Sequence, residues 1–372
     1  MSNWNETYYF PKEILEQADA IQNCLNDLQN DIRQICIKHK EIEKIQIVGS
    51  GDCYYITFAA MEAFKKIAGI NAQGFEAYDY YLNEPEVNEK TLVILLSSSG
   101  KSLYLLKSAE YAVQAGGVTV GVTNHDDSPL GTMCTVSLVT KAIGVSRSFP
   151  SKTTTSALAI MYQMAYEMGR INKVQSEEKY KRLSDELSTE VPAMIRKVYE
   201  NEHEKLTLAS QMFFDASSYM FVGSGPCRST AFVGAAKIVE TSRKHVTFCN
   251  AEEYLHLHGF SVRSSDVVTV ISNNISSHRE TQVVEYARNQ CARILVVGDI
   301  SIGNRSENIL QIGEFLKSLS PFGIALVSMV VLHLFACELS KKANIDPDLP
   351  HGVDIKHVIS LLYTGPVAGW QV

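Results

Sequence analysis

The sequence predicts an α/β protein made of two copies of one unit, each a parallel sheet flanked by helices. Short apolar strand-like runs alternate with segments of helical periodicity, which is typical of parallel sheets with helices on both faces. The first half has a strand that ends in Gly49-Ser50-Gly51-Asp52, and the second half has a strand that ends in Gly223-Ser224-Gly225-Pro226. In the same way, the serine-rich turn at 97–102 in the first half corresponds to the turn at 272–277 in the second. This duplication is a much more specific signal than either turn alone.

The elements follow from hydrophobic periodicity, taken in chain order. In the first half we expect an amphipathic helix within 12–41, strands at 44–48, 91–96, 118–122 and 135–139, a region of unassigned type around 73–78, and helices at 53–68, 103–115 and 153–168. In the second half we expect strands at 218–222, 267–271 and 293–297, a helix at 281–290 and a buried helix at 322–337.

A charged helical segment at 175–206 is expected to connect the two halves. The expected organisation is an N-terminal helical extension (1–40), a first domain (41–172), a helical linker (173–207), a second domain (208–340) and a C-terminal tail (341–372).

Composition limits the function. The 372 residues are 45% hydrophobic and 20% charged, with a net charge of -7, which argues against a nucleic-acid surface but leaves room for a small anionic ligand. The first residues lack the pattern of a signal peptide, and the apolar run 322–337 is too short for a bilayer span, so we expect no membrane partner. The eight cysteines are scattered without metal-ligand spacing, which predicts reduced thiols in the cytoplasm, no metal and no cofactor.

The turn in LVILLSSSGKS (92–102) is the strongest candidate for chemistry. A buried strand followed by serines and a helix start offers hydroxyls, backbone N–H groups and the positive end of a helix dipole at one point. This suits a phosphate without a metal, although a serine-rich connector with an N-cap serine is an equally weighted alternative. A nucleotide P-loop is rejected, because Leu95 stands where its leading glycine belongs.

Six segments resemble the SIS (sugar isomerase) family of phosphosugar-binding domains, and most of all the double-SIS isomerase half of glucosamine-6-phosphate synthase and its relatives, the fructosamine-6-phosphate deglycases and ketose/aldose phosphate isomerases. GSGDCYY (49–55) resembles the family's CGTS-type turn, SSSGKS (97–102) its SQSGET phosphate loop, and SFPSKTTTSAL (148–158) its VASTKxFT segment. GAAKIVETS (234–242) is similar to GALKLKEIS, AEEYLHLHG (251–259) to an E-x-x-H-G element, and DPDLPHGVDIKHV (346–358) to the NPDxPxxLxKV tail. The resemblance implies two tandem SIS domains, each a flavodoxin-like three-layer sandwich.

The resemblance also implies roles for residues. The hydroxyls of Ser97, Ser99 and Ser102 would hold the sugar phosphate, with backbone help from Ser98 and Gly100. Glu240 would be the catalytic base, Lys356 of the tail would meet the open-chain carbonyl and complete the active site, and His256 or His258 would open the sugar ring. Further substrate-binding positions would be Ser50, Gly51, Asp52, Cys53, Ser151, Lys152 and Lys237.

Several positions stay open at this point. An ungapped count from Glu240 favours His256, whereas the His-Gly dipeptide favours His258. Periodicity alone favours a solvated Glu240, or one paired with Lys237 three residues earlier, over a base. Asp52-Cys53 replaces the Thr-Ser of the synthase pattern, Lys101 stands where an acid is usual, and Pro150 replaces a serine.

The function implied is an enzyme that acts on a 6-phosphorylated (amino) sugar, as a fructosamine-6-phosphate deglycase or as an aldose–ketose or aminosugar phosphate isomerase. A glutaminase domain is not expected, because the chain starts Met1-Ser2-Asn3 with about 40 residues before the first sheet. The family's histidine often crosses into a neighbouring subunit, which implies a homodimer with active sites at the subunit interface. The alternative is a phosphosugar sensor without turnover.

Overall fold

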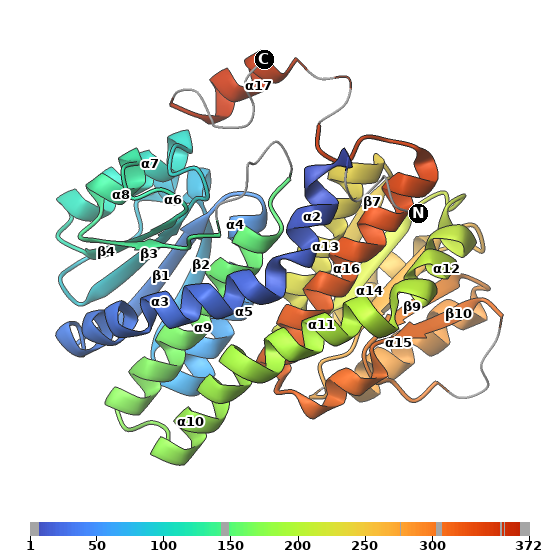
Figure 1. The fold of residues 1–372 in the computed structure, drawn as a ribbon, viewed down its shortest axis with the longest axis horizontal. Coiled ribbons are helices and arrows are strands. Elements are labelled where there is room, and N and C mark those ends of the chain that lie inside the picture. The colour runs from blue at the N-terminus through green and yellow to red at the C-terminus, as the bar shows by residue number, and fades with distance from the viewer. Residues whose placement is uncertain are drawn as a thin grey trace. The chain divides into compact units, whose positions relative to one another are not determined.

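The computed structural model describes residues 7–142, 149–275, 277–302, 307–349, 352 and 354–364 (Figure 1). The chain divides into two compact units, named here by their strands: the β1–β5 unit (residues 19–189 and 350–372) and the β6–β10 unit (residues 1–18 and 190–349). The boundaries fall at 18/19, within the expected extension, at 189/190, within the expected linker, and at 349/350, within the expected C-terminal tail.

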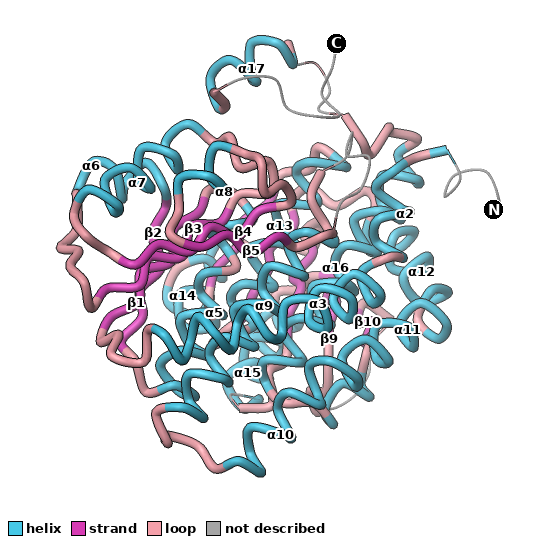
Figure 2. The backbone as a smooth tube through the Cα atoms, turned by 60° about the vertical axis from the view of Figure 1, so that its left-hand side comes forward, coloured by secondary structure: helices cyan, strands magenta, loops and turns pink. Residues whose placement is uncertain are grey.

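The β1–β5 unit holds a sheet of five parallel strands in the order β2-β1-β3-β4-β5. Helices α6, α7 and α8 cover one face, and α3, α5 and α9 lie on the other (Figure 2). Its elements are α3 Gln17–Lys38, β1 Lys44–Gly49, α4 Asp52–Tyr55, α5 Thr57–Ala63, the π-helical turn η1 Phe64–Ala68, β2 Asn71–Glu76, α6 Ala77–Asn83, β3 Thr91–Leu96, α7 Leu103–Gln114, β4 Val118–Thr123, α8 Pro129–Met133, β5 Val136–Val139, α9 Lys152–Ile171, α10 Glu177–Asp185, η2 Glu186–Glu190 and α17 Ile355–Leu362. The first two residues of α3, Gln17 and Ala18, and the last residue of η2, Glu190, belong to the β6–β10 unit.

The β6–β10 unit repeats this plan with five parallel strands in the order β10-β9-β8-β6-β7. Helices α14 and α15 pack their apolar residues on one face of the sheet. Its elements are α2 Tyr9–Leu15, α11 Val191–Asn201, α12 His203–Phe213, β6 Tyr219–Gly223, α13 Cys227–Ser242, β7 Val246–Cys249, α14 Ala251–His256, η3 His258–Ser261, β8 Val267–Ile271, α15 Ser277–Asn289, β9 Arg293–Val297, β10 Ile309–Ile312, η4 Glu314–Ser318 and α16 Pro321–Ala343.

Burial explains why the central strands form. Every residue of β3, β6 and β8 is buried, as expected for strands covered by helices on both faces. The predicted α/β architecture with two helix-flanked parallel sheets is therefore confirmed. In each sheet the first strand lies between the second and third, so the crossover direction reverses there, and such a switch point at the carboxyl edge is where open α/β sheets bind ligands.

Three details differ from the sequence prediction. The helix expected over 53–68 is broken into α4, α5 and η1, and the amphipathic pattern of 12–41 belongs to two helices, α2 and α3. Strands β7 and β10 were not predicted, because each is a four-residue strand at a sheet edge with only one fully buried residue.

Helix α16 is, within the described residues, the one helix long and apolar enough to cross a membrane. Of its most apolar window, 94% is buried inside the protein, which is the behaviour of a core helix. The prediction of a buried helix over 322–337 is confirmed.

Candidate functional site

Three serine hydroxyls converge where β3 ends. Ser97 Oγ lies 3.1 Å from Ser102 Oγ and 3.5 Å from Ser99 Oγ. Ser102 occupies the N-cap position of α7, yet its side chain makes no capping hydrogen bond. The hydroxyl that an N-cap serine ordinarily gives to its helix faces the other serines instead. The result is a cluster of hydroxyl groups at the start of a 12-residue helix, which is an arrangement suited to an anion.

The backbone of the loop fixes how these hydroxyls can bond. The N–H of Gly100 donates to Ser97 Oγ at 3.1 Å, and the N–H of Lys101 donates to Ser99 Oγ at 3.2 Å. Both oxygens therefore accept hydrogen bonds from the backbone of the loop, which fixes their positions. Gly100 has a φ of +64°, and a Cβ there would lie 2.1 Å from Ser128 Oγ, so only glycine fits.

The turn after β1 lies at the same edge, because β1 and β3 are paired neighbours. A Cβ on Gly49 would lie 2.6 Å from the carbonyl of Cys53, and Gly51 has a φ of +57°. Ser50 Oγ donates to Glu76 Oε1 at 2.8 Å, so this hydroxyl is already engaged with the end of β2. Asp52 is buried and begins α4, whereas Cys53 is half-buried.

Two threonines at the start of α9 connect these turns. Ser98 Oγ donates to Thr153 Oγ1 at 3.3 Å, and Thr154 Oγ1 donates to Asp52 Oδ2 at 3.3 Å. The sequence analysis did not single out Thr153 or Thr154, although the run Thr-Thr-Thr directly after the predicted Ser151-Lys152 was a usable signal.

Ser151 and Lys152, which resemble family substrate-binding positions, are both buried at this helix start. The hydroxyl of Ser151 has no hydrogen-bond partner among the described residues. Behind the serine loop lies a void of about 10 Å³, bounded in part by Cys53, Ser98 and Thr153, which is room for one water molecule.

The C-terminal tail meets the serine loop through its last described residues. Tyr363 forms an antiparallel bridge with Ser102, and the N–H of Thr364 donates to the carbonyl of Lys101 at 3.0 Å. Lys356 is exposed on α17, and its backbone N–H donates a hydrogen bond to Asp354 Oδ1 at 3.0 Å. The structure thus brings the tail to the loop by residues that the sequence analysis did not name.

Glu240 and Lys237 form a pair on α13 in the β6–β10 unit. Lys237 Nζ lies 2.7 Å from Glu240 Oε2, with the lysine side chain fully buried and the glutamate side chain 26% exposed. Of the alternatives for Glu240, the structure therefore shows pairing with Lys237 rather than free solvation. A carboxylate that faces a buried ammonium ion is stabilised in its ionised form.

His256 and His258 lie in the surface segment that joins α14 to η3. His256 Nε2 lies 3.3 Å from Glu252 Oε2 with 78% of its side chain exposed, and His258 is half-buried at the start of η3. The Arg279 guanidinium pairs with the same glutamate and lowers the pKa of that carboxyl. Leu257 and Phe260, beside the histidines, are exposed by 59% and 72%.

The second glycine turn has the backbone of the first. A Cβ on Gly223 would lie 2.2 Å from the carbonyl oxygen of Cys227, and Gly225 has a φ of +56°. Asn273, in the turn after β8, donates through Nδ2 to the carbonyl of Ser224 at 2.8 Å.

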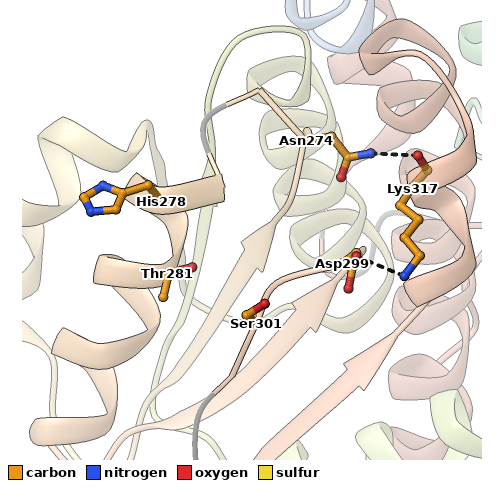
Figure 3. A pocket seen from close by; sticks show the side chains of 6 residues that line it. All are labelled: Asn274, His278, Thr281, Asp299, Ser301 and Lys317. Carbon is orange, nitrogen blue, oxygen red and sulfur yellow. Dashed lines mark hydrogen bonds and ion pairs between the residues drawn. The ribbon is translucent and has the colours of Figure 1, made fainter.

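A cavity of about 420 Å³ opens near this edge (Figure 3). It is lined by Asn274, His278, Thr281, Asp299, Ser301 and Lys317. Its one lysine lies 3.3 Å from the carboxylate of Asp299, so the charges in the cavity are paired with each other. The serine cluster thus has no described counterpart here, while Ser276 and the side chain of Ser277 lie outside the described residues.

No group of three or more histidine, cysteine or acidic side chains converges in a metal-binding arrangement within the part of the chain that the structure describes.

Comparison with known proteins gives one family and one fold. Residues 39–168 match the SIS domain family. The glutamine–fructose-6-phosphate aminotransferase (isomerizing) of Thermococcus kodakarensis is 27% identical over 93% of this chain and 57% of its own length, so the chain spans about three-fifths of that relative.

Two solved structures share the fold. The C-terminal domain of glucosamine-fructose-6-phosphate aminotransferase from Francisella tularensis has a TM-score of 0.81 at 18% identity and covers 92% of this chain and 98% of its own. The tagatose-6-phosphate ketose/aldose isomerase of Escherichia coli has a TM-score of 0.73 at 15% identity, covering 94% and 96%.

Proposed function

We propose that this protein, whose residues 39–168 match the SIS domain family, is an enzyme that acts on a 6-phosphorylated sugar. It would be an aldose–ketose or aminosugar phosphate isomerase, or a fructosamine-6-phosphate deglycase. The observation that carries the proposal is the convergence of Ser97, Ser99 and Ser102, with the Ser102 hydroxyl facing Ser97 rather than capping α7. Relatives of similar fold are named for hexose-6-phosphate chemistry, which supports the same substrate class.

The serine loop would bind the phosphate group. Hydrogen bonds from a hydroxyl to a charged phosphate oxygen contribute about 1–3 kcal/mol each. Because the phosphate is remote from the reacting carbons, this energy can hold the sugar chain in a reactive orientation. Asp52, Cys53, Ser151 and Lys152 are proposed to contact the rest of the substrate, as in the resemblance.

Glu240 is proposed as the base. In an aldose–ketose isomerisation, a base takes a proton from the carbon next to the carbonyl and returns a proton to the neighbouring carbon, so no oxidant is needed. Pairing with Lys237 at 2.7 Å supports this role, because it favours the ionised carboxylate that can accept a proton. Lys356 is proposed to meet the open-chain carbonyl, and His256 or His258 to assist ring opening.

A homodimer is part of the proposal, with the histidine segment acting in the partner's active site. The exposure of His256, Leu257 and Phe260 in a single chain supports it. The test mixes two inactive variants, Glu240→Gln and a His256→Ala/His258→Ala double variant. Recovered activity in the mixture supports a histidine that crosses between subunits, whereas activity that stays lost contradicts it.

The proposed setting is the reducing cytoplasm, supported by eight cysteines that are all free in the structure. The flavodoxin-like sandwich is proposed for each unit on the strand order, in which the first strand of each sheet lies between the second and third.

The main experiment incubates the protein with a panel of 6-phosphorylated fructosamines, hexosamines and hexoses and identifies products by mass spectrometry. Isomerised or deglycated products define the reaction, and absence of turnover across the panel contradicts the enzyme proposal. Glu240→Gln should keep phosphosugar binding and lose turnover. In a sensor, which is the alternative, the same variant would keep both binding and biological response.

Titration calorimetry tests the serine loop directly. Replacing Ser97, Ser99 and Ser102 by alanine should weaken phosphosugar binding by several kcal/mol, at about 1–3 kcal/mol for each lost bond. Ser217→Ala, on an exposed serine of the other unit, is the control and should leave affinity unchanged. Unchanged affinity in the triple variant would exclude the loop as the phosphate site.

A further inference from the structure

Helices α13 and α16 pack against each other in a constant register. Thr230 Oγ1 donates to the carbonyl of Ala325 at 2.7 Å, and Thr241 Oγ1 donates to the carbonyl of Ala336 at 3.4 Å, each across 95 residues. Between these contacts lies Gly234, where a Cβ would lie 2.3 Å from Leu332 Cδ1. The two helices therefore run parallel and in close contact along this face.

Lys237 belongs to the same face of α13. Positions 230, 234, 237 and 241 follow the spacing of one helix stripe, and the register of 95 sets Lys237 level with Leu332 and His333. Lys237 and His333 both have 0% exposure. The buried ammonium ion of Lys237 thus lies at about the same height along the helix pair as the buried imidazole of His333. A positive charge on both groups at once would be unfavourable.

Gln17 determines which nitrogen of His333 carries the proton. Gln17 Nε2 donates to the carbonyl of Ile14 at 3.1 Å, so the amide oxygen is directed to the ring, 3.1 Å from His333 Nδ1. Because an amide oxygen only accepts, Nδ1 must bear the hydrogen. Nε2 then keeps its lone pair in a neutral ring, and it has no hydrogen-bond partner within the described residues.

Burial, together with the charge of Lys237, lowers the pKa of His333 well below its ordinary value. Elements packed against α16 carry other charged groups, and Lys237 is the charged group among them that contributes to this lowering. The other charged or titratable groups on these elements are Lys12 and Glu13 on α2, Arg196, Lys197 and Glu200 on α11, Glu202, His203, Glu204 and Lys205 at the start of α12, Arg228 and Glu240 on α13, and Glu314 and Lys317 on η4.

We propose that Gln17 and His333 are positioning residues for the Lys237–Glu240 pair. The amide of Gln17 holds His333 as the neutral Nδ1–H tautomer, so that the Lys237 ammonium ion acts on Glu240 without a second positive charge from the ring. This inference rests on the proposed role of Glu240 as the base. Its consequence is that the basicity of Glu240 is set in part by Gln17 and His333, which act on the carboxylate through the charge near Lys237.

Nitrogen-15 NMR of histidine-labelled protein tests the state of the ring without any substrate. His333→Asn identifies the signal and keeps an amide donor toward Gln17. We expect a neutral Nδ1–H tautomer in the wild type from pH 5.5 to 8, and a ring that titrates within this range in Gln17→Glu, where a carboxylate faces Nδ1. An imidazolium or an Nε2–H tautomer in the wild type at pH 7 would overturn the proposal.

The coupling to Glu240 is read by carbon-13 NMR of glutamate-labelled protein, with Glu240→Gln to identify the signal. In Gln17→Glu the pKa of Glu240 should fall, because a charged His333 adds positive charge near the pair. The Gln17→Glu/His333→Asn double variant should restore the wild-type value. A pKa of Glu240 that does not respond while His333 titrates would refute the positioning role.

Kinetics then separate this inference from the proposed function. With a substrate from the panel, Gln17→Glu should lower kcat about three- to tenfold below the new pKa of His333 and leave KM unchanged, since a weaker base transfers the proton more slowly. The double variant should not show this drop in kcat at low pH, and a drop that persists there would contradict the proposal. If no substrate is turned over, the proposed function fails, while the two NMR experiments still decide the state and influence of His333.

Gln17 is fully buried, so Gln17→Glu is checked first for folding. Gln17→Met serves if it does not fold, because it keeps the side-chain length and removes the acceptor. The preference for the Nδ1–H tautomer should then be lost, and a tautomer that persists in Gln17→Met would contradict control by Gln17.

Discussion

Ser98 and Thr153, 55 residues apart in sequence, are joined by a hydrogen bond of 3.3 Å between their hydroxyl groups. The bond ties the serine loop after β3 to the first turn of α9. The next residue, Thr154, donates to Asp52 in the turn after β1. The start of α9 therefore holds two turns of the candidate site in one arrangement.

Thr153→Val should weaken phosphosugar binding about fivefold, because it removes a hydrogen bond worth about 1 kcal/mol while keeping the shape of the side chain. Titration calorimetry measures the change. Thr155→Val is the matched control: its hydroxyl donates to carbonyls of its own helix, at Ser151 and Lys152, and its replacement should leave affinity unchanged. Equal effects of the two variants on affinity would argue against a role of the Ser98–Thr153 hydrogen bond in phosphosugar binding.

Gly100→Ala should destabilise the protein and weaken phosphosugar binding together. A left-handed backbone costs a non-glycine residue about 1–2 kcal/mol, and the added methyl would also collide with Ser128 Oγ. Gly116→Ala has the same kind of backbone, with a φ of +81°, but meets no atom within 4 Å, so it should show the backbone cost alone and keep affinity. Urea unfolding and calorimetry compare the two, and an equal loss in both would exclude the collision.

The Lys237–Glu240 pair should respond unequally to removal of either partner. Glu240→Leu removes the carboxylate beside a fully buried lysine, which should cost about 3 kcal/mol of unfolding free energy. Lys237→Met leaves a glutamate that is 26% exposed and can be hydrated, so its cost should be about 1 kcal/mol or less. Urea unfolding measures both, and the reverse order would mean that the lysine charge is solvated.

One cysteine should react rapidly with a thiol reagent at pH 8. Cys291 is the exposed cysteine of the eight, whereas burial raises the pKa of Cys24 to about 11 and those of Cys134 and Cys249 to about 12. Thiols with raised pKa values are almost fully protonated at pH 8 and react slowly. Ellman's reagent should thus show a fast thiol that disappears in Cys291→Ser, and fast reaction of Cys24, Cys134 or Cys249 in native protein would contradict their burial.

The sequence predicted the elements that lie in the core better than those at the edges. Strands 91–96, 267–271 and 293–297 form with the predicted bounds, because each is a mainly apolar run; apart from Arg293 at the start of the last strand, their side chains are all buried. Strands β7 and β10 have no such run: they form because a longer neighbouring strand offers hydrogen bonds, which is information that a local pattern does not contain.

The same distinction applies to the candidate site. Ser97, Ser99 and Ser102 are close in sequence, so their convergence after a buried strand could be predicted. The contacts of Ser98 with Thr153, of Lys101 with Thr364 and of His333 with Gln17 span 55, 263 and 316 residues, and only the folded chain reveals them. The proposed roles of Glu240, His256, His258 and Lys356 stay predictions from the resemblance.

The paired glycine turns have a consequence for how the two halves can diverge. Gly49 against Cys53 and Gly223 against Cys227 shape the chain through backbone contact, without using the side chains between them. The polar residues between these contacts can therefore be exchanged while the strand-to-helix turn is kept. They belong to Ser50-Gly51-Asp52 in one half and to Ser224-Gly225-Pro226 in the other. Ligand specificity can change in one copy without a change in the fold of either.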